Sequence, residues 1–140
     1  MIRVYVDVVG DLFHVGHINL LERAKSQGDF LIVGVHSDAS TAQYKRTPII
    51  SEEDRYKMVS SCRYVDEVIE DAPLCITLDF LASHKIDLVI HGDDFNEIYK
   101  NQHSDVIKEG KMKYLPYTPG ISTTKIIDRV LNLYQKKEKL

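Results

Sequence analysis

The sequence predicts an α/β fold in which helices cover both faces of a mostly parallel, five-stranded sheet. Residues 2–9 and 30–35 are nearly continuous apolar runs, as expected for strands buried on both faces. Segments with helical spacing of apolar residues follow such runs. The 140 residues have the length of one ordinary domain, and no Ser-, Gly- or Pro-rich linker divides them. We therefore expect residues 1–140 to form a single doubly wound domain.

Five strands and four helices follow from the pattern along the chain. We expect strands at 2–9, 30–35, 65–69, 87–90 and 112–115, and helices at 17–27, from Ser51, at 78–83 and from Ser122. Ser51 begins the sequence SEED, which resembles a capping box. Parallel strands joined by right-handed crossovers place ligands beyond their carboxyl ends, where the strand order reverses. The segments that deserve inspection are therefore 10–17, 36–45, 91–99 and 116–124.

Composition and charge favour a globular protein acting on small molecules. The net charge is −3, and the one basic cluster lies among the last residues, which disfavours a dedicated nucleic-acid binder. Arg3 and Asp7 interrupt the first ten residues, so we expect neither a signal peptide nor a membrane-binding segment, and a cytoplasmic location. Cys62 and Cys75 form no CxxC pair, and we expect two reduced thiols without a role.

Two histidines at the mouth of the first predicted helix suggest a phosphate site. Residues 14–17 read HVGH, so His14 and His17 flank a glycine directly after the first strand and its turn. Imidazoles beside the free N–H groups of a helix start would create a concavity suited to anions. Two polar residues at a helix start without a function are the alternative interpretation.

The HVGH segment resembles the HxGH signature of the nucleotidylyltransferase superfamily, and further segments resemble its cytidylyltransferase branch. The matches occur in family order and extend over about residues 2–134: LIVGVHSD at 31–38, EDRY at 53–56, RYVDEV at 63–68 and GISTT at 120–124. The likeness is greatest to the enzymes of the phosphoethanolamine and phosphocholine pathways, followed by the glycerol-3-phosphate cytidylyltransferases. This resemblance implies a Rossmann-like fold.

The resemblance also implies an activity, the transfer of CMP from CTP to a phosphorylated small molecule with release of pyrophosphate. His14, His17 and Lys45 are the implied catalytic residues, because they would neutralise charge on the phosphates. Mg²⁺ is expected to be bound mainly by the triphosphate, and we name no metal ligand in the chain. The implied nucleotide-binding residues are Val9, Gly10, Arg55, Arg63, Asp66, Asp94, Tyr117, Thr118, Ser122 and Thr123. Surface ion pairing or a subunit contact is the alternative for Arg55, Arg63 and Asp66.

The acceptor is implied by Asp7, at the end of the first strand. The amino-alcohol branch has an aspartate here that would face a cationic head group, and Phe95 and Tyr99 are candidates to wall that site. Leu74 replaces the aromatic residue of the choline enzymes, which favours phosphoethanolamine over phosphocholine. A structural aspartate satisfied by backbone donors is the alternative for Asp7.

Two departures from the family pattern leave other functions open. The family's Gly-x-Phe-Asp turn is replaced by VVGD at 8–11, and Tyr117 stands where the family has an arginine. The alternatives are a glycerol-3-phosphate cytidylyltransferase, an adenylyltransferase acting on a heptose phosphate or a flavin, and a catalytically silent nucleotide-binding module. Related enzymes are dimers, so the resemblance also implies a homodimer.

Overall fold

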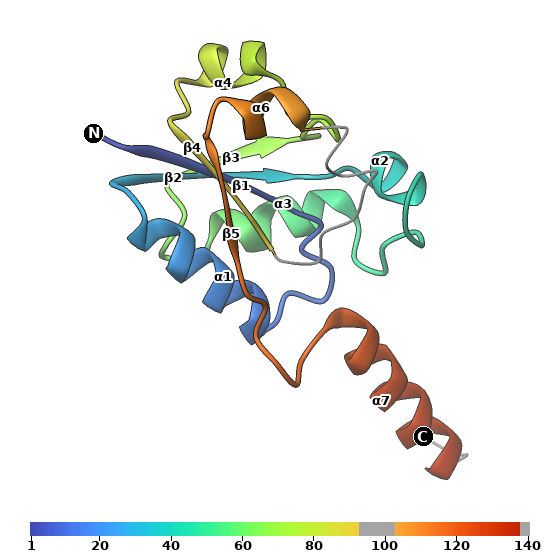
Figure 1. The fold of residues 1–140 in the computed structure, drawn as a ribbon. Coiled ribbons are helices and arrows are strands. Elements are labelled where there is room, and N and C mark those ends of the chain that lie inside the picture. The colour runs from blue at the N-terminus through green and yellow to red at the C-terminus, as the bar shows by residue number, and fades with distance from the viewer. Residues whose placement is uncertain (93–102, 138–140) are drawn as a thin grey trace.

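A central sheet of five strands organises the computed structural model, which describes residues 1–92 and 103–137. The strands lie in the order β3-β2-β1-β4-β5 and every neighbouring pair is parallel (Figure 1). Their bounds are β1 Arg3–Val8, β2 Phe30–Val35, β3 Glu67–Glu70, β4 Leu88–Gly92 and β5 Met112–Leu115. The predicted parallel α/β fold is confirmed.

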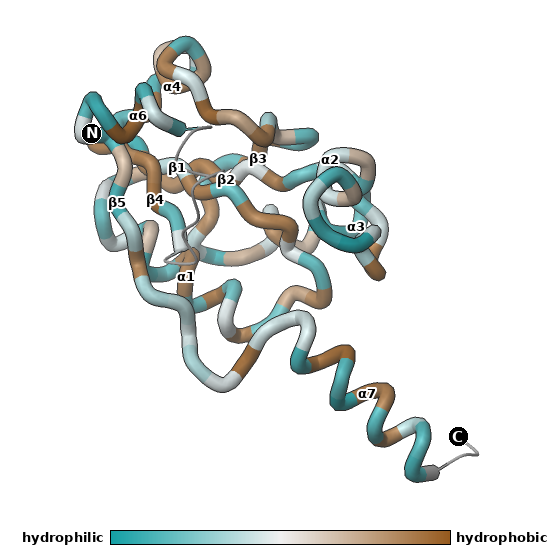
Figure 2. The backbone as a smooth tube through the Cα atoms, turned by 45° about the vertical axis from the view of Figure 1, so that its right-hand side comes forward, coloured by the Kyte–Doolittle hydropathy of each residue, from teal (hydrophilic) through white to brown (hydrophobic). Residues whose placement is uncertain are grey.

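Helices cover both faces of this sheet, as expected. Helices α1 (Val15–Ser26) and α3 (Glu52–Ser60) lie on one face, while α4 (Leu78–His84) and α6 (Ser104–Lys108) lie on the other (Figure 1). Two apolar cores result, one on each face, and neighbouring β1 residues such as Val4 and Tyr5 contribute to opposite cores. The apolar colouring of the strands in Figure 2 marks this interior. A short helix, α2 (Asp38–Ala42), follows β2.

The predicted capping box at Ser51 is wrong in its detail. Helix α3 begins at Glu52 and Ser51 is its N-cap residue, but the serine side chain makes no capping hydrogen bond. Glu52 accepts a hydrogen bond from the backbone N–H of Asp38 at 2.9 Å instead. The first turn of α3 is therefore tied to the start of α2.

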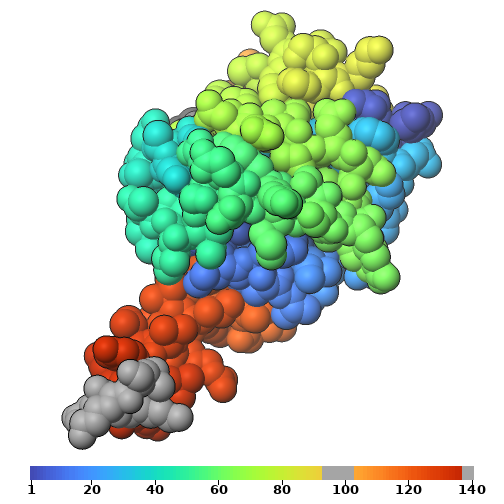
Figure 3. Space-filling view, turned by 180° about the vertical axis from the view of Figure 1, so that it is seen from behind, coloured from blue at the N-terminus to red at the C-terminus, as the bar shows by residue number. Residues whose placement is uncertain are grey.

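The last helix, α7 (Thr123–Lys137), departs from the expected layering. It extends away from the body of the protein instead of lying on the sheet (Figures 1 and 3). Val130, Leu131 and Tyr134 on its apolar stripe are 58%, 52% and 56% exposed. Among the described helices, none is long and apolar enough to cross a membrane.

The strand order determines where a site can form. The connection from β1 leads to β2 on one side of it, whereas β4 lies on its other side, so the order reverses between β1 and β4. Loops leaving these strands separate at that point and leave a crevice at the carboxyl edge of the sheet. The four segments singled out from the sequence all begin at this edge.

Candidate active site

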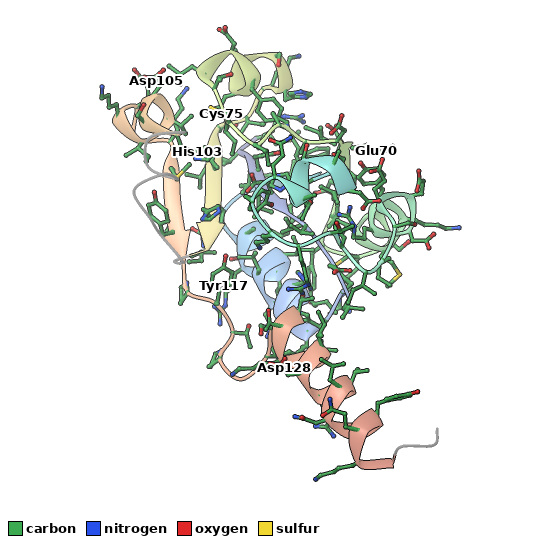
Figure 4. The ribbon with its side chains drawn as sticks, turned by 90° about the vertical axis from the view of Figure 1, so that its right-hand side faces the viewer. Glu70, Cys75, His103, Asp105, Tyr117 and Asp128 are labelled. Atoms are coloured by element: carbon green, nitrogen blue, oxygen red, sulfur yellow. The ribbon has the colours of Figure 1, made fainter. Side chains whose placement is uncertain are left out.

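A cavity of about 910 Å³ opens at this edge of the sheet. It lies between the segments that follow β1, β2 and β5 and the end of β4, together with the first turns of α1 and α7. Tyr117, labelled in Figure 4, belongs to the segment between β5 and α7. The predicted residues on its wall are Asp7, Val9, His14, His17, Lys45, Tyr117, Thr118, Ser122 and Thr123.

The two histidines of the HVGH segment cap the helix that they begin. His14 is the N-cap residue of α1, and its Nδ1 accepts the N–H of Gly16 at 3.0 Å. The Nδ1 of His17 accepts the N–H of His14 at 3.1 Å, which completes a reciprocal capping box. Because each Nδ1 is an acceptor, the proton of each neutral ring is on Nε2. Each imidazole therefore keeps one N–H for a ligand.

Burial keeps both rings uncharged at neutral pH. Desolvation is the largest cause that lowers the pKa of His17 to about 4, with further lowering by His14 and Lys45 against a raising effect of Asp11. Desolvation also lowers the pKa of His14. The His17 ring is stacked on Phe13 with an interplanar angle of 8°. The two imidazoles are thus fixed hydrogen-bond donors and not cations.

The start of α7 forms the cavity wall that faces the two histidines. Ser122 Oγ accepts the N–H of Lys125 at 3.1 Å, so the predicted serine cap is confirmed. Thr123 Oγ1 donates to the carbonyl of Asp11 at 2.9 Å, which joins α7 to the turn after β1. Nearby, Asn19 Nδ2 on α1 donates to Thr118 Oγ1 at 3.1 Å. The expected convergence of the first crossover and the final helix on one pocket is confirmed.

Tyr117 packs onto the backbone at the end of β4. A Cβ atom added to Gly92 would lie only 2.1 Å from Tyr117 Cζ, so the ring occupies the space that glycine leaves. The tyrosine remains 47% exposed on the cavity wall. It therefore offers the cavity an aromatic ring in place of the family's guanidinium.

The turn after β1, at residues 8–11, is stabilised by contacts with helix α3. Gly10 has a φ of +73°, which allows the chain to turn after Val9. Val9 lines the cavity, and its carbonyl accepts Arg55 Nη1 at 2.6 Å. Gly10 is buried against Val59 and is not among the residues that line the cavity; it shapes the turn, and its contact with the nucleotide stays a prediction.

Arg55 also differs from the prediction of a nucleotide contact. Its side chain is fully buried and does not line the cavity. The guanidinium donates to the carbonyls of Val9, His36 and Ile50 and to the carboxylate of Asp38, at 2.6 to 3.0 Å. The arginine supports the segments that follow β1 and β2, because it satisfies carbonyls that leave the sheet there.

Arg63 and Asp66 lie away from the cavity. Arg63 is exposed and stacks on Tyr64, with its Cζ 5.0 Å from the ring centroid. Asp66 Oδ2 accepts the N–H of Leu31 at 2.8 Å and also bonds Lys25 Nζ. Leu31 is near the amino end of β2, whereas the cavity lies beyond the carboxyl ends. Within one chain, neither residue is placed to contact a nucleotide in the cavity.

Asp7 is the predicted acceptor-site residue that lies within the described part of the chain, and its side chain is 4% exposed. Its Oδ2 is 3.3 Å from His36 Nε2. Burial alone would raise the pKa of Asp7, but the hydrogen bond with His36 and the charges of His36, His91 and His103 outweigh it, so the pKa lies below its ordinary value. The carboxylate is therefore ionised at neutral pH. The predicted Asp94, Phe95 and Tyr99 lie outside the described residues.

Asp11, His36 and Tyr44 are among the wall residues that were not identified from the sequence. Asp11 accepts the N–H groups of Ile49 and Ile50, each at 2.9 Å, and so holds the loop before α3. His36 and Tyr44 form the contact with Asp7 and extend it toward that loop. Their only sequence signal was position, since Asp11 and His36 follow strand ends in the segments selected for inspection.

Comparisons with known proteins identify the family. The cytidylyltransferase-like family model matches residues 10–129. This chain belongs to the cytidylyltransferase-like family. The ethanolamine-phosphate cytidylyltransferase of Dictyostelium discoideum is 42% identical over 132 residues, which cover 93% of this chain and 37% of that protein. The human choline-phosphate cytidylyltransferase A is 43% identical over 143 residues, covering 95% and 37%. The cytidylyltransferase-like chain thus spans less than half the length of these curated relatives.

A solved structure supports the fold of the cytidylyltransferase-like chain over almost its whole length. The lipopolysaccharide core biosynthesis protein of Thermoplasma volcanium superposes with a TM-score of 0.68 at 30% identity. The match covers 84% of this chain and 97% of that protein. The pantothenate synthetase of Thermus thermophilus, at 15% identity and a TM-score of 0.53, shares the fold.

Proposed function

We propose that this cavity transfers CMP from CTP to a phosphorylated amino alcohol, with phosphoethanolamine preferred over phosphocholine, and releases pyrophosphate. The observation that carries the proposal is the convergence of two neutral imidazoles, each with its proton on Nε2, and the amino end of α7 on one cavity. The helix end contributes a partial positive charge. Ethanolamine-phosphate and choline-phosphate cytidylyltransferases among the relatives support the choice of substrates.

In this reaction a phosphate oxygen of the acceptor attacks the α-phosphorus of CTP in line. The new phosphorus–oxygen bond forms as the bond to the α–β bridging oxygen breaks, and pyrophosphate leaves with that electron pair. His14 and His17 donate from Nε2 to the triphosphate, where negative charge moves during the reaction. Lys45 on the loop after α2 neutralises the two approaching phosphates. The protein therefore acts by positioning and charge neutralisation, without a covalent intermediate.

Magnesium fits this proposal as an ion that arrives with the nucleotide. Asp7 and Asp11, the carboxylates that the described part of the chain places on the cavity wall, are already engaged by His36 and by two backbone amides. Within residues 1–92 and 103–137, no group of three His, Cys, Asp or Glu side chains is arranged to hold a metal. A triphosphate supplies the oxygen ligands that Mg²⁺ prefers, and the ion would offset part of its charge.

The preference for an amino alcohol rests on Asp7. An ionised, buried carboxylate favours a cation that can donate hydrogen bonds to it. His36 occupies Oδ2, so an ammonium group would dock on Oδ1. Leu74 lines this cavity where the choline enzymes have an aromatic residue, which favours the primary ammonium of phosphoethanolamine over a quaternary one that relies on an aromatic cage.

A panel of nucleotides and acceptors tests the activity. Pyrophosphate release is measured with CTP and with ATP, each against phosphoethanolamine, phosphocholine, glycerol-3-phosphate and a heptose phosphate. We expect the highest kcat/KM with CTP and phosphoethanolamine. A preference for glycerol-3-phosphate would contradict the acceptor assignment, and a preference for ATP would contradict the nucleotide. Silence with every pair, together with measurable CTP binding, would identify a binding module.

The proposal includes a homodimer. The exposed apolar stripe of α7 supports it, because contiguous apolar surface of this kind favours association. Analytical ultracentrifugation of the protein should give twice the mass of one chain. A variant with Leu131→Glu and Tyr134→Glu should sediment as a monomer if the stripe is the contact. Wild-type protein that sediments as a monomer at micromolar concentration would contradict the dimer.

A further inference from the structure

A line of three polar side chains connects the floor of the cavity to the lysine loop, residues 43–51. Asp7 Oδ2 is 3.3 Å from His36 Nε2, and His36 Nδ1 is 2.6 Å from Tyr44 Oη. The contact between Asp7 and His36 follows from the parallel pairing of β1 with β2, in which Asp7 is opposite Gly34 and His36 comes two residues later. Both side chains are less than 10% exposed, whereas Tyr44 is 47% exposed. The line therefore runs from the interior to the surface.

The ionised carboxylate fixes the direction of these hydrogen bonds. Asp7 can only accept, so the imidazole donates to it from Nε2. In the tautomer whose single proton is on Nε2, His36 Nδ1 accepts and the hydroxyl of Tyr44 donates to it. In this arrangement Asp7 only accepts and the Tyr44 hydroxyl only donates. Losing Asp7 or Tyr44 therefore changes which ring nitrogen of His36 carries the proton.

Side-chain hydrogen bonds hold the lysine loop on both sides of Lys45. After Lys45, the carboxylate of Asp11 accepts the N–H groups of Ile49 and Ile50. Before it, Tyr44 is anchored on His36. Lys45 is exposed, and its Nζ is 5.6 Å from the centroid of the Tyr44 ring. The backbone N–H of Lys45 also donates to the Thr41 carbonyl at 2.9 Å, so this turn and the anchored Tyr44 together place the lysine relative to the cavity.

We propose that His36 is a positioning residue that, through Tyr44, fixes Lys45 over the cavity and joins it to the carboxylate of Asp7. This inference rests on the proposed function, in which Asp7 takes the acceptor's ammonium and Lys45 its phosphate. His36 then sets the distance between Asp7, which binds the ammonium end of the substrate, and Lys45, which binds its phosphate end. An acceptor is selected by its length between cation and phosphate as well as by its charge.

Limited trypsin digestion tests the positioning without any substrate. Trypsin cleaves after Lys45 and Arg46, which are exposed within the loop. Tyr44→Phe should raise the cleavage rate there about fivefold, the effect of one lost net hydrogen bond on the anchored population. Tyr134→Phe, which removes a phenol oxygen from the exposed face of α7, is the matched control and should be cleaved like the wild type at these two bonds.

Two substitutions of His36 distinguish the roles of its two ring nitrogens. An asparagine amide can take the place of Nδ1, and a glutamine amide that of Nε2. His36→Asn should retain a partner for Tyr44 and keep most of the protection, whereas His36→Gln should be cleaved as fast as Tyr44→Phe. Equal protection in the glutamine variant, or a wild-type rate in Tyr44→Phe, would overturn the proposal. Thermal unfolding of each variant shows whether increased cleavage reflects the loop or the whole fold.

Kinetics distinguish positioning from general damage. Tyr44→Phe should lower kcat/KM for phosphoethanolamine at least about fivefold while the KM for CTP stays within about twofold, because the triphosphate is held by other groups. Equal losses toward both substrates would contradict the coupling. If the wild type turns over none of the substrates, the proposed function fails and the trypsin result alone decides whether His36 anchors the loop.

Discussion

The histidines of the cavity are oriented in two different ways. His14 and His17 lie three residues apart and are oriented by backbone amides of their own helix turn. His36 is oriented by a carboxylate from a neighbouring strand, 29 residues away in the chain. In the proposed function, His14 and His17 present uncharged donors to a polyphosphate, and His36 joins the Asp7 carboxylate to the loop that carries Lys45. The proposed nucleotide wall can thus form locally at a helix start, whereas the proposed acceptor wall needs the assembled sheet.

The largest effect is expected on the nucleotide wall. His17→Ala should lower kcat by about 10²- to 10³-fold, the usual result of deleting one preorganised donor to the transition state. His17→Asn retains an acceptor for the His14 N–H but loses the Nε2 donor, so it should lower kcat to a similar extent with less change in thermal stability. Steady-state pyrophosphate release measures both. Wild-type turnover in either variant would remove His17 from the mechanism.

A smaller and more selective effect is expected on the acceptor wall. Asp7→Asn removes the negative charge that would bind the ammonium, so the KM for phosphoethanolamine should rise about 10- to 100-fold, as for loss of a buried charge-assisted hydrogen bond. The KM for CTP should change by less than about threefold. Glycerol-3-phosphate, which carries no cation, serves as the control acceptor. Equal weakening of CTP and phosphoethanolamine would indicate a structural aspartate.

The two walls should also differ in their response to acid. The pKa of His17 is about 4 in the native state and 6.5 in the unfolded chain. Between these pH values the ring is protonated in the unfolded chain but not in the native state. Its contribution to stability is present above pH 6.5 and is lost as the pH falls toward 4. The pKa of Asp7 is lowered, so its contribution to stability is present above its ordinary value of 3.8 and is lost only as the pH falls below it.

Urea unfolding at pH 7 and pH 4.5 measures this difference. The free energy of unfolding of the wild type relative to His17→Asn should fall by about 1 to 3 kcal/mol between the two pH values. Asp7→Asn should show no comparable change relative to the wild type in this window. A constant difference between the wild type and His17→Asn would contradict the neutral, desolvated state of the ring.

Much of the fold was predictable because it depends on local patterns. The apolar run of residues 30–35 is observed as β2 and that of 112–115 as β5, and Ser122 caps α7 as expected. The path of α7 was not predictable, since its period indicates an apolar face but not what covers that face. The short helix α6 was also missed, because its five residues are too few to show a period.

The site was predictable where a motif is local and unpredictable where partners are distant. The HVGH residues form both the cap and the donors, so their role follows from four neighbouring positions. Arg55 resembled a nucleotide ligand, yet its guanidinium joins three loops whose proximity only the folded sheet creates. The contact from Asp7 to Tyr44 likewise depends on the register of β1 and β2.

A titration with CTP, followed by NMR, tests the central claim that the first crossover and the final helix hold one triphosphate. The account predicts that the Nε2 signals of His14 and His17 and the amides of Thr123 and Thr124 shift together with a single Kd. The amides of Arg63 and Asp66, at the other edge of the sheet, should stay unchanged. Shifts confined to one of the two walls, or different Kd values for them, would contradict the shared site.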